Sequence, residues 1–245
     1  MTTSDPSSPA PQMGLLARAI GVITAPRATF ERIVADPRPF GILFVVAIVI
    51  GLATGLPQMT EAGRQATLDA QIRQTEQWTG QPVGPEQVVR LEQMSQYNAY
   101  FAIIGTFVML PVISLLLTAI YWALFNAILG GTASFKQVLA IVTHAQVIGA
   151  LGAVIGVPIQ IMQGTMTTAG PFNLGALAPM LEEGSGLANF LGSISVFSIW
   201  GVFVTAIGLA VLYRRKTAPI FITLLALFLA IMAFFTVGLP GMFRG

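Results

Sequence analysis

Long stretches without any charged residue divide this chain. Five of them lie between Arg38 and Arg244, and they contain 22, 43, 45, 30 and 27 residues. A helix needs about 20 apolar residues to cross the hydrocarbon core of a bilayer. Two crossings would need a very tight turn in the second stretch, and the later half of the third is rich in Gly and Pro. We therefore predict five spans, at about residues 40–57, 97–129, 135–162, 187–213 and 218–239.

The composition supports this interpretation. Charged residues make up 9% of the 245 positions and hydrophobic residues 55%, whereas a soluble chain carries about 25% charge. So few charges cannot cover the surface of a soluble fold. The sequence predicts an all-α, polytopic helical membrane protein, with residues 40–245 forming its transmembrane domain and the lipid bilayer as its main partner.

Basic residues in the loops predict the orientation, because cytoplasmic loops carry an excess of Lys and Arg. The N-terminal side of the predicted topology holds the larger set: Arg18, Arg27, Arg32, Arg38, Lys136, Arg214, Arg215 and Lys216. The other side holds Arg64, Arg73, Arg90 and Arg244. We expect a multi-pass protein of the inner (plasma) membrane, with the N-terminus in the cytoplasm and the C-terminus outside.

Two segments lie before the first span. Residues 1–13 are rich in Ser, Thr and Pro and predict a disordered tail. Residues 14–39 alternate apolar positions with Arg18, Arg27 and Arg32, which predicts amphipathic helices in the cytoplasmic interface with these arginines near lipid headgroups. Alternatively, the helices pack on the cytoplasmic end of the bundle, and the two arrangements are compatible.

Residues 58–96 form the largest polar segment, rich in Gln. Gly80 and Pro82 break a helical pattern that restarts at Gly84-Pro85. The segment predicts a helical hairpin outside the membrane, on the extracytoplasmic side. We favour a soluble linker over a cap that docks a partner.

Apart from Lys136 at the very start of the third, no charged residue falls inside a predicted span, which argues against a proton relay or an ion-coupled pump. The candidate intramembrane polar residues are His144, Gln137, Asn126 and Ser195. His144 could bond a serine of the fourth span and titrate near neutrality, although such histidines are more often packing residues.

Small residues predict close helix packing. Gly51 and Gly55, and Gly152 and Gly156, have GxxxG spacing, and Gly149 extends the second strip. In lipid, such strips let backbones approach. We expect contacts within one chain, with a homo-oligomer interface as the alternative.

Several classes of chemistry are excluded by counting. The chain has no cysteine and one histidine, so we expect no disulfide, metal or other cofactor. It has no GxSxG elbow, no phosphate-binding loop and no Ser/His/Asp arrangement, so we expect no enzyme. A net charge of +2 provides no basic face for nucleic acid.

Three segments resemble the bacterial branch of the Yip (Ypt-interacting protein) domain family. Residues 24–33, TAPRATFERI, are similar to its Pro-x-x-Thr-Phe lead-in, and residues 130–139, GGTASFKQVL, are similar to its Gly-Gly-x-x-Ser-Phe-Lys turn. Residues 84–88, GPEQV, restart a helix before a long second span. The resemblance implies a five-helix membrane protein with a cytosolic N-terminal region. The Asp-Leu-Tyr-Gly-Pro signature of eukaryotic members, which associate with small GTPases and vesicle traffic, is absent.

Two functional hypotheses follow. The first is a non-enzymatic membrane protein that organises lipid or recruits a membrane-protein partner through its N-terminal helices. The second is a small transporter or channel component that uses the polar groups of the third and fourth spans.

Overall fold

A computed structural model describes residues 13–164, 170–178, 180–182 and 185–243. The predicted tail, apart from residue 13, lies outside these ranges. So does Arg244, one of the four basic residues in the smaller predicted set.

Within these described ranges, five helical segments are long and apolar enough to cross a membrane, as predicted. The spans are Pro39–Met59, Asn98–Ile128, Phe135–Met162, Val196–Tyr213 and Thr217–Gly241. The helices that compose them are α3 (Pro39–Gly55), α6 (Asn98–Leu129), α7 (Phe135–Ala145), α8 (Val147–Met162), α10 (Val196–Tyr213) and α11 (Thr217–Ala233). The first ends in the 3₁₀ turn η1 (Leu56–Met59), and the last continues through the π turn η3 (Phe234–Gly238) into α12 (Leu239–Phe243).

The fourth span begins later than expected. Instead of one helix over 187–213, a short helix α9 (Gly186–Gly192) is separate from α10. Ser195 and Ser198 form a capping box that starts α10 afresh. An antiparallel bridge pairs Ser195 with Asn173, the residue that precedes the 3₁₀ turn η2 (Leu174–Leu177). The chain is therefore extended just before α10.

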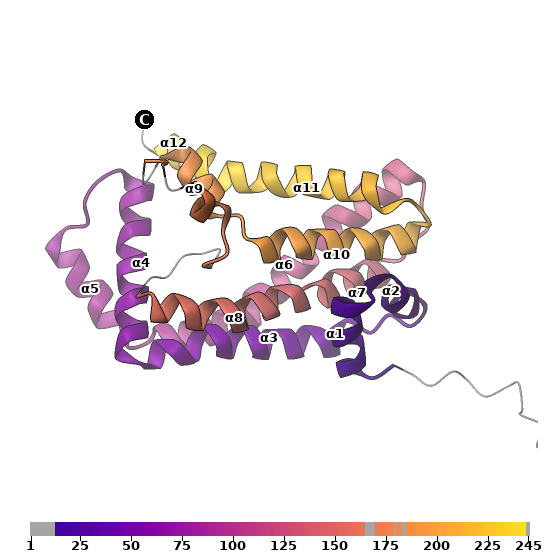
Figure 1. Cartoon of the computed structure of the whole chain (residues 1–245), viewed down its shortest axis with the longest axis horizontal. Helices are drawn as coiled ribbons and strands as arrows, with labels where there is room; N and C mark the ends of the chain where they lie inside the picture. Colours follow the sequence, from indigo (N-terminus) through magenta and orange to yellow (C-terminus); the bar gives the residue numbers. More distant parts are fainter. Residues whose placement is uncertain (1–12, 165–169, 179, 183–184, 244–245) are drawn as a thin grey trace, which may run out of the picture.

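The two ends of the bundle differ (Figure 1). One end carries α1 (Leu15–Thr24), α2 (Pro26–Ala35), the α6–α7 turn and the α10–α11 turn. We call this the basic end, because it holds all eight Lys and Arg of the larger predicted set. The opposite end carries α9, α12 and the hairpin of α4 (Glu61–Thr79) and α5 (Pro85–Ser95).

The hairpin follows the sequence pattern closely. Thr60 caps α4 by accepting a hydrogen bond from the amide of Gly63, and Gly80 ends it with φ 70°. Pro85 then occupies the first turn of α5. No residue of α5 is buried, so this helix adds little to the core.

The largest core lies where α2, α7 and α10 meet, at the basic end. Residues 138–145 of α7 are all buried, and Phe30, Ile33 and Leu209 join them in one apolar cluster. Elsewhere α3 packs along α6, and α10 along α11. Large apolar side chains such as Ile104, Leu116 and Ile222 remain exposed on the outside of the bundle, as expected for a surface that faces lipid.

A candidate membrane-contact site at the basic end

The N-terminal helices are part of the core. Phe30 and Ile33 of α2 and Val22 of α1 are completely buried. Phe30 lies over Gly208 of α10, where a Cβ atom would be 3.1 Å from the Phe30 ring and 2.5 Å from Ile141. The inner faces of α1 and α2 therefore pack on the end of the bundle, which was the alternative arrangement considered for these helices.

Arg18 differs most from its predicted role. Its guanidinium is buried, with the residue 2% exposed. Nε donates to the carbonyl of Met13 at 3.1 Å, Nη1 to the carbonyl of Asp36 at 3.1 Å, and Nη2 to Asp36 Oδ2 at 3.0 Å. We expected Arg18 near lipid headgroups, but its donors are used within the chain. The proposal of headgroup contact is therefore left to Arg27 and Arg32, which are exposed.

Asp36 is shared between two arginines. Its Oδ1 accepts a hydrogen bond from Nε of Arg38 at 3.0 Å, and its Oδ2 accepts one from Nη2 of Arg18 at 3.0 Å. The hydrogen bond from Arg38 and the nearby positive charge of both arginines hold the pKa of Asp36 below its usual value of 3.8, against a smaller desolvation effect. The segment that leads into the first span is thus fixed by charge-assisted bonds.

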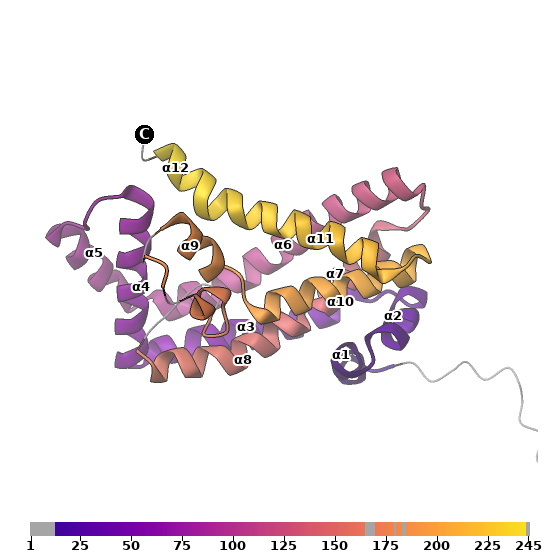
Figure 2. The same cartoon turned by 45° about the horizontal axis from the view of Figure 1, so that its top comes forward.

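The outer face of α1 is apolar. Leu16 is 74% exposed and Ile20 52%, while Arg18 and Val22 point into the protein. The helix runs across the direction of the spans and is seen nearly end-on in Figure 2. Arg27 on α2 is exposed, and its Nε lies 3.8 Å from Oε1 of Glu31. The basic end therefore presents apolar side chains on a helix that lies across the bundle.

Gln137 and Asn126 also lie at the basic end. Gln137 completes a capping box with Ser134 at the start of α7, and its Nε2 donates to the carbonyl of Val34 at 3.2 Å, which links α7 to α2. Asn126 Oδ1 accepts from the hydroxyl of Tyr213 at 3.0 Å. Both candidates thus hold helix ends together.

His144 and Ser195 occupy different environments. His144 is fully buried; its Nδ1 lies 2.7 Å from the carbonyl of Ala140, and within the described chain its Nε2 has no partner. The expected bond to a serine of the fourth span is therefore not made. Ser195 caps the start of α10, while Asn126 contacts its last residue. An 18-residue helix is about 27 Å long, so the candidate polar residues are not gathered in one place.

Four of the five candidate packing glycines face a neighbour. A Cβ atom added to Gly51 would lie 3.6 Å from Ile103, and one added to Gly55 would lie 2.5 Å from the same residue. A Cβ atom on Gly152 would lie 2.9 Å from Phe197, and one on Gly156 would lie 3.2 Å from Pro171. At Gly149 it would meet nothing within 4 Å. Gly149 is exposed, so it does not make the helix contact within the chain that the sequence predicted for it.

Several of the residues that fix the basic end were not singled out individually from the sequence. A Cβ on Gly21 would lie 2.4 Å from Thr29 Oγ1, so Thr29 and Phe30 of the lead-in each fit against a glycine. Gly130 adopts φ 61°, and a Cβ on Gly131 would lie 2.5 Å from the Tyr213 ring. The resemblance pointed to these two segments; periodicity alone could not show which distant glycine each side chain meets.

Comparison with known proteins agrees with this architecture. The model of the Yip1 domain family matches residues 20–239. The membrane protein YknW of Bacillus subtilis (strain 168) is 27% identical over 190 residues, which cover 77% of this chain and 75% of YknW. No solved structure gives a significant match. The matched region contains α2, the first four spans, most of the fifth and both turns at the basic end.

Proposed function

The chain belongs to the Yip1 domain family of membrane proteins, and from this premise we propose that it organises the membrane without catalysis, through the outer face of α1. The basic end would lie in the cytoplasm, where a membrane-protein partner could also dock. Its excess of Lys and Arg over the opposite end supports that orientation.

One observation carries the proposal: α1 has its inner face locked into the bundle and its outer face apolar. Arg18 and Val22 are buried, while Leu16 and Ile20 are exposed. An amphipathic helix that lies in the interface displaces headgroups and inserts apolar side chains into the acyl boundary. Because the bundle holds α1 in place, the ordering cost of inserting it has already been met during folding.

The transporter alternative has less support. It needs Asn126, His144 and Ser195 to line one path, but Asn126 contacts the last residue of α10 and Ser195 caps its first turn. His144 is enclosed by the core.

Spin labelling tests where α1 lies. The chain has no cysteine, so Leu16→Cys can carry a single nitroxide in liposomes of phosphatidylethanolamine and phosphatidylglycerol. Val89→Cys on α5 and Ile104→Cys on α6, both exposed, serve as the water and lipid references. We expect the label at position 16 to be more accessible to oxygen, and less to a water-soluble nickel chelate, than the label at position 89. Equal accessibility at positions 16 and 89 would refute membrane insertion of α1.

Vesicle shape tests the function itself. We expect the wild-type protein to narrow or tubulate such vesicles in cryo-electron micrographs, and the pair Leu16→Glu and Ile20→Glu to lose this effect. The matched control is Val89→Glu with Met94→Glu, which places the same charges on exposed apolar positions of α5. Unaltered vesicles with wild-type protein, or equal loss in both pairs, would contradict the proposal.

A further inference from the structure

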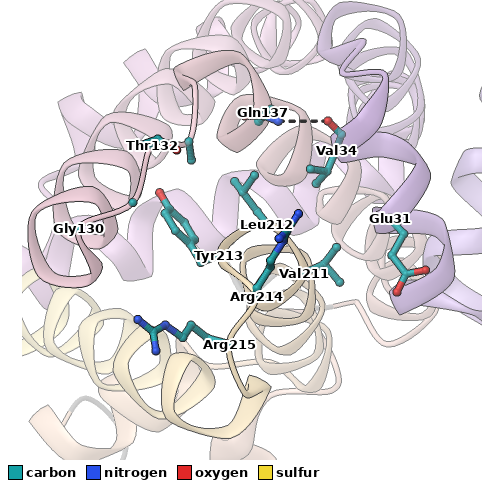
Figure 3. A pocket seen from close by; sticks show the side chains of 12 residues that line it. Glu31, Val34, Gly130, Thr132, Gln137, Val211, Leu212, Tyr213, Arg214 and Arg215 are labelled. Carbon is teal, nitrogen blue, oxygen red and sulfur yellow. Dashed lines mark hydrogen bonds between the residues drawn. The ribbon is translucent and has the colours of Figure 1, made fainter.

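A second feature of the basic end is an open cavity of about 670 Å³. It lies between α2, the α6–α7 turn and the end of α10 (Figure 3). Glu31 and Val34 line it from α2, Gly130 to Ala133 from the turn, and Gln137 from the first turn of α7. Val211 to Tyr213 line it from the end of α10, and Arg214 and Arg215 from the residues that follow. We propose that this cavity binds the phosphate-bearing headgroup of an anionic phospholipid.

The depth of the cavity suits a headgroup. Two spans end beside it, at Ile128 and Tyr213, and a third begins at Phe135. Residues at the ends of spans lie at the level of the lipid headgroups. The apolar side chains of Val211 and Leu212 line the same cavity as the arginines, which matches a ligand that has a charged group and an apolar part.

The charge of the cavity suits an anion. Arg214 and Arg215 both line it, both are exposed, and neither has an ion pair or side-chain hydrogen bond within the described chain. The one acidic residue in the lining, Glu31, lies on the α2 side and is 3.8 Å from Arg27. The two side chains point in different directions in Figure 3, and neither guanidinium group is held by another described residue. Each is therefore available to bind a phosphate, which arginine does in a bidentate manner.

Backbone donors are also available. Gly131 and Thr132 line the cavity, and their amides donate no hydrogen bond within the part of the chain that is described. A Cβ on Gly131 would collide with the Tyr213 ring, so glycine is required where this turn meets α10. Amides in a turn can supplement arginine in holding a phosphate.

The backbone conformation of Arg214 favours a role for its side chain in binding. It is the one described residue other than glycine with positive φ, at 53°, where it ends α10. Glycine would adopt this conformation without steric cost. An arginine here is strained, as residues at binding sites often are.

The cavity is too large for a phosphate ion alone and falls within the range of ligand sites, about 300–1,000 Å³. A phosphodiester headgroup with its glycerol fits that size. This site is separate from Leu16 and Ile20 on the outer face of α1, so either proposal can fail alone.

Native mass spectrometry of the detergent-purified protein tests the site, with phosphatidylglycerol and phosphatidylcholine titrated at equal concentrations. We expect the wild-type protein to prefer phosphatidylglycerol. The double variant Arg214→Gly and Arg215→Gln should weaken that binding about 25-fold, at roughly fivefold per arginine. Its midpoint of thermal unfolding should stay the same or rise, because a glycine at the end of α10 would remove the strain of positive φ.

The matched control is Arg73→Gln with Arg90→Gln, which removes the same charge from exposed positions at the opposite end. It should keep wild-type binding. Equal weakening in both double variants, or no preference for phosphatidylglycerol, would overturn the proposal. Adding inorganic phosphate or glycerol 3-phosphate separates the two sources of phosphate: if either displaces the lipid at micromolar concentration, the site serves a soluble phosphate and the lipid assignment is wrong.

Discussion

Arg18 binds Asp36 at two points, through the backbone carbonyl at 3.1 Å and the carboxylate at 3.0 Å. These bonds join the start of α1 to the segment that precedes the first span, so that α1 and α2 form a closed unit on the bundle. The bonds fix the angle at which the outer face of α1 is presented. They also make the position of α1 sensitive to the charge on Asp36.

Asp36→Asn tests that sensitivity. Because the folded-state pKa of Asp36 is lowered by Arg38 and Arg18, its charge stabilises the fold above pH 3.8, and this contribution is lost as the pH falls through the lowered pKa. We expect the variant to unfold at a lower temperature than wild type at pH 5–7, followed by circular dichroism in detergent. The difference should narrow as the pH falls below 3.8 and close below the lowered pKa. A constant difference from pH 7 to pH 3 would show that the charge is not what matters.

Gly208→Ala tests the docking of α2. The new methyl group would enter the space of Ile141 and Phe30, at 2.5 and 3.1 Å, and should destabilise the protein by about 1–3 kcal/mol. Gly201→Ala, on the same helix with nothing within 4 Å, should be neutral or slightly stabilising. Equal stability of the two variants, measured by unfolding in mixed micelles, would mean that Phe30 does not rest on Gly208.

His144→Met separates a packing histidine from a functional one. Nε2 has no partner in the described chain, and Nδ1 bonds only the carbonyl of Ala140 on the same helix. Replacing this buried, half-satisfied ring by an apolar side chain of similar size should therefore cost little. We expect the free energy of unfolding to change by less than about 1 kcal/mol and the remodelling of vesicles to be unchanged. Loss of remodelling in a folded variant would show that His144 has a functional role.

Gly152→Ala and Gly149→Ala test the small-residue strip on α8. At Gly152 the added methyl would lie 2.9 Å from Phe197, whereas at Gly149 it would meet nothing within 4 Å. The first should destabilise the protein by about 1–2 kcal/mol, and the second should not. If Gly149→Ala instead changes the oligomeric state seen by light scattering in detergent, this face is an interface between copies.

The spans were predictable because the cost of charge in lipid sets their limits directly. The runs between Arg38 and Glu61 and between Lys216 and Arg244 bound the first and last spans. The fourth span was predicted too long, because uncharged residues near Asn189 continue the apolar run although Ser195 restarts the helix. Hydropathy alone does not show that a capping box starts a new helix within an apolar run.

The site was less predictable, since it depends on contacts across long sequence distances. Arg18 looked like a surface arginine on an amphipathic helix, and only the approach of Asp36 shows why it can be buried. Asn126 and Gln137 looked like intramembrane polar residues, yet they bond groups at helix ends. A single sequence shows the polar residue but not its partner.

Labelling with a membrane-impermeant maleimide tests the central claim most directly. Lys136→Cys and Lys216→Cys lie at the basic end and Arg90→Cys at the opposite end, and all three positions are exposed. In intact spheroplasts, we predict labelling at position 90 only, with positions 136 and 216 reacting after the membrane is opened. Labelling of positions 136 and 216 from opposite sides would contradict the five-span bundle with a cytoplasmic basic end.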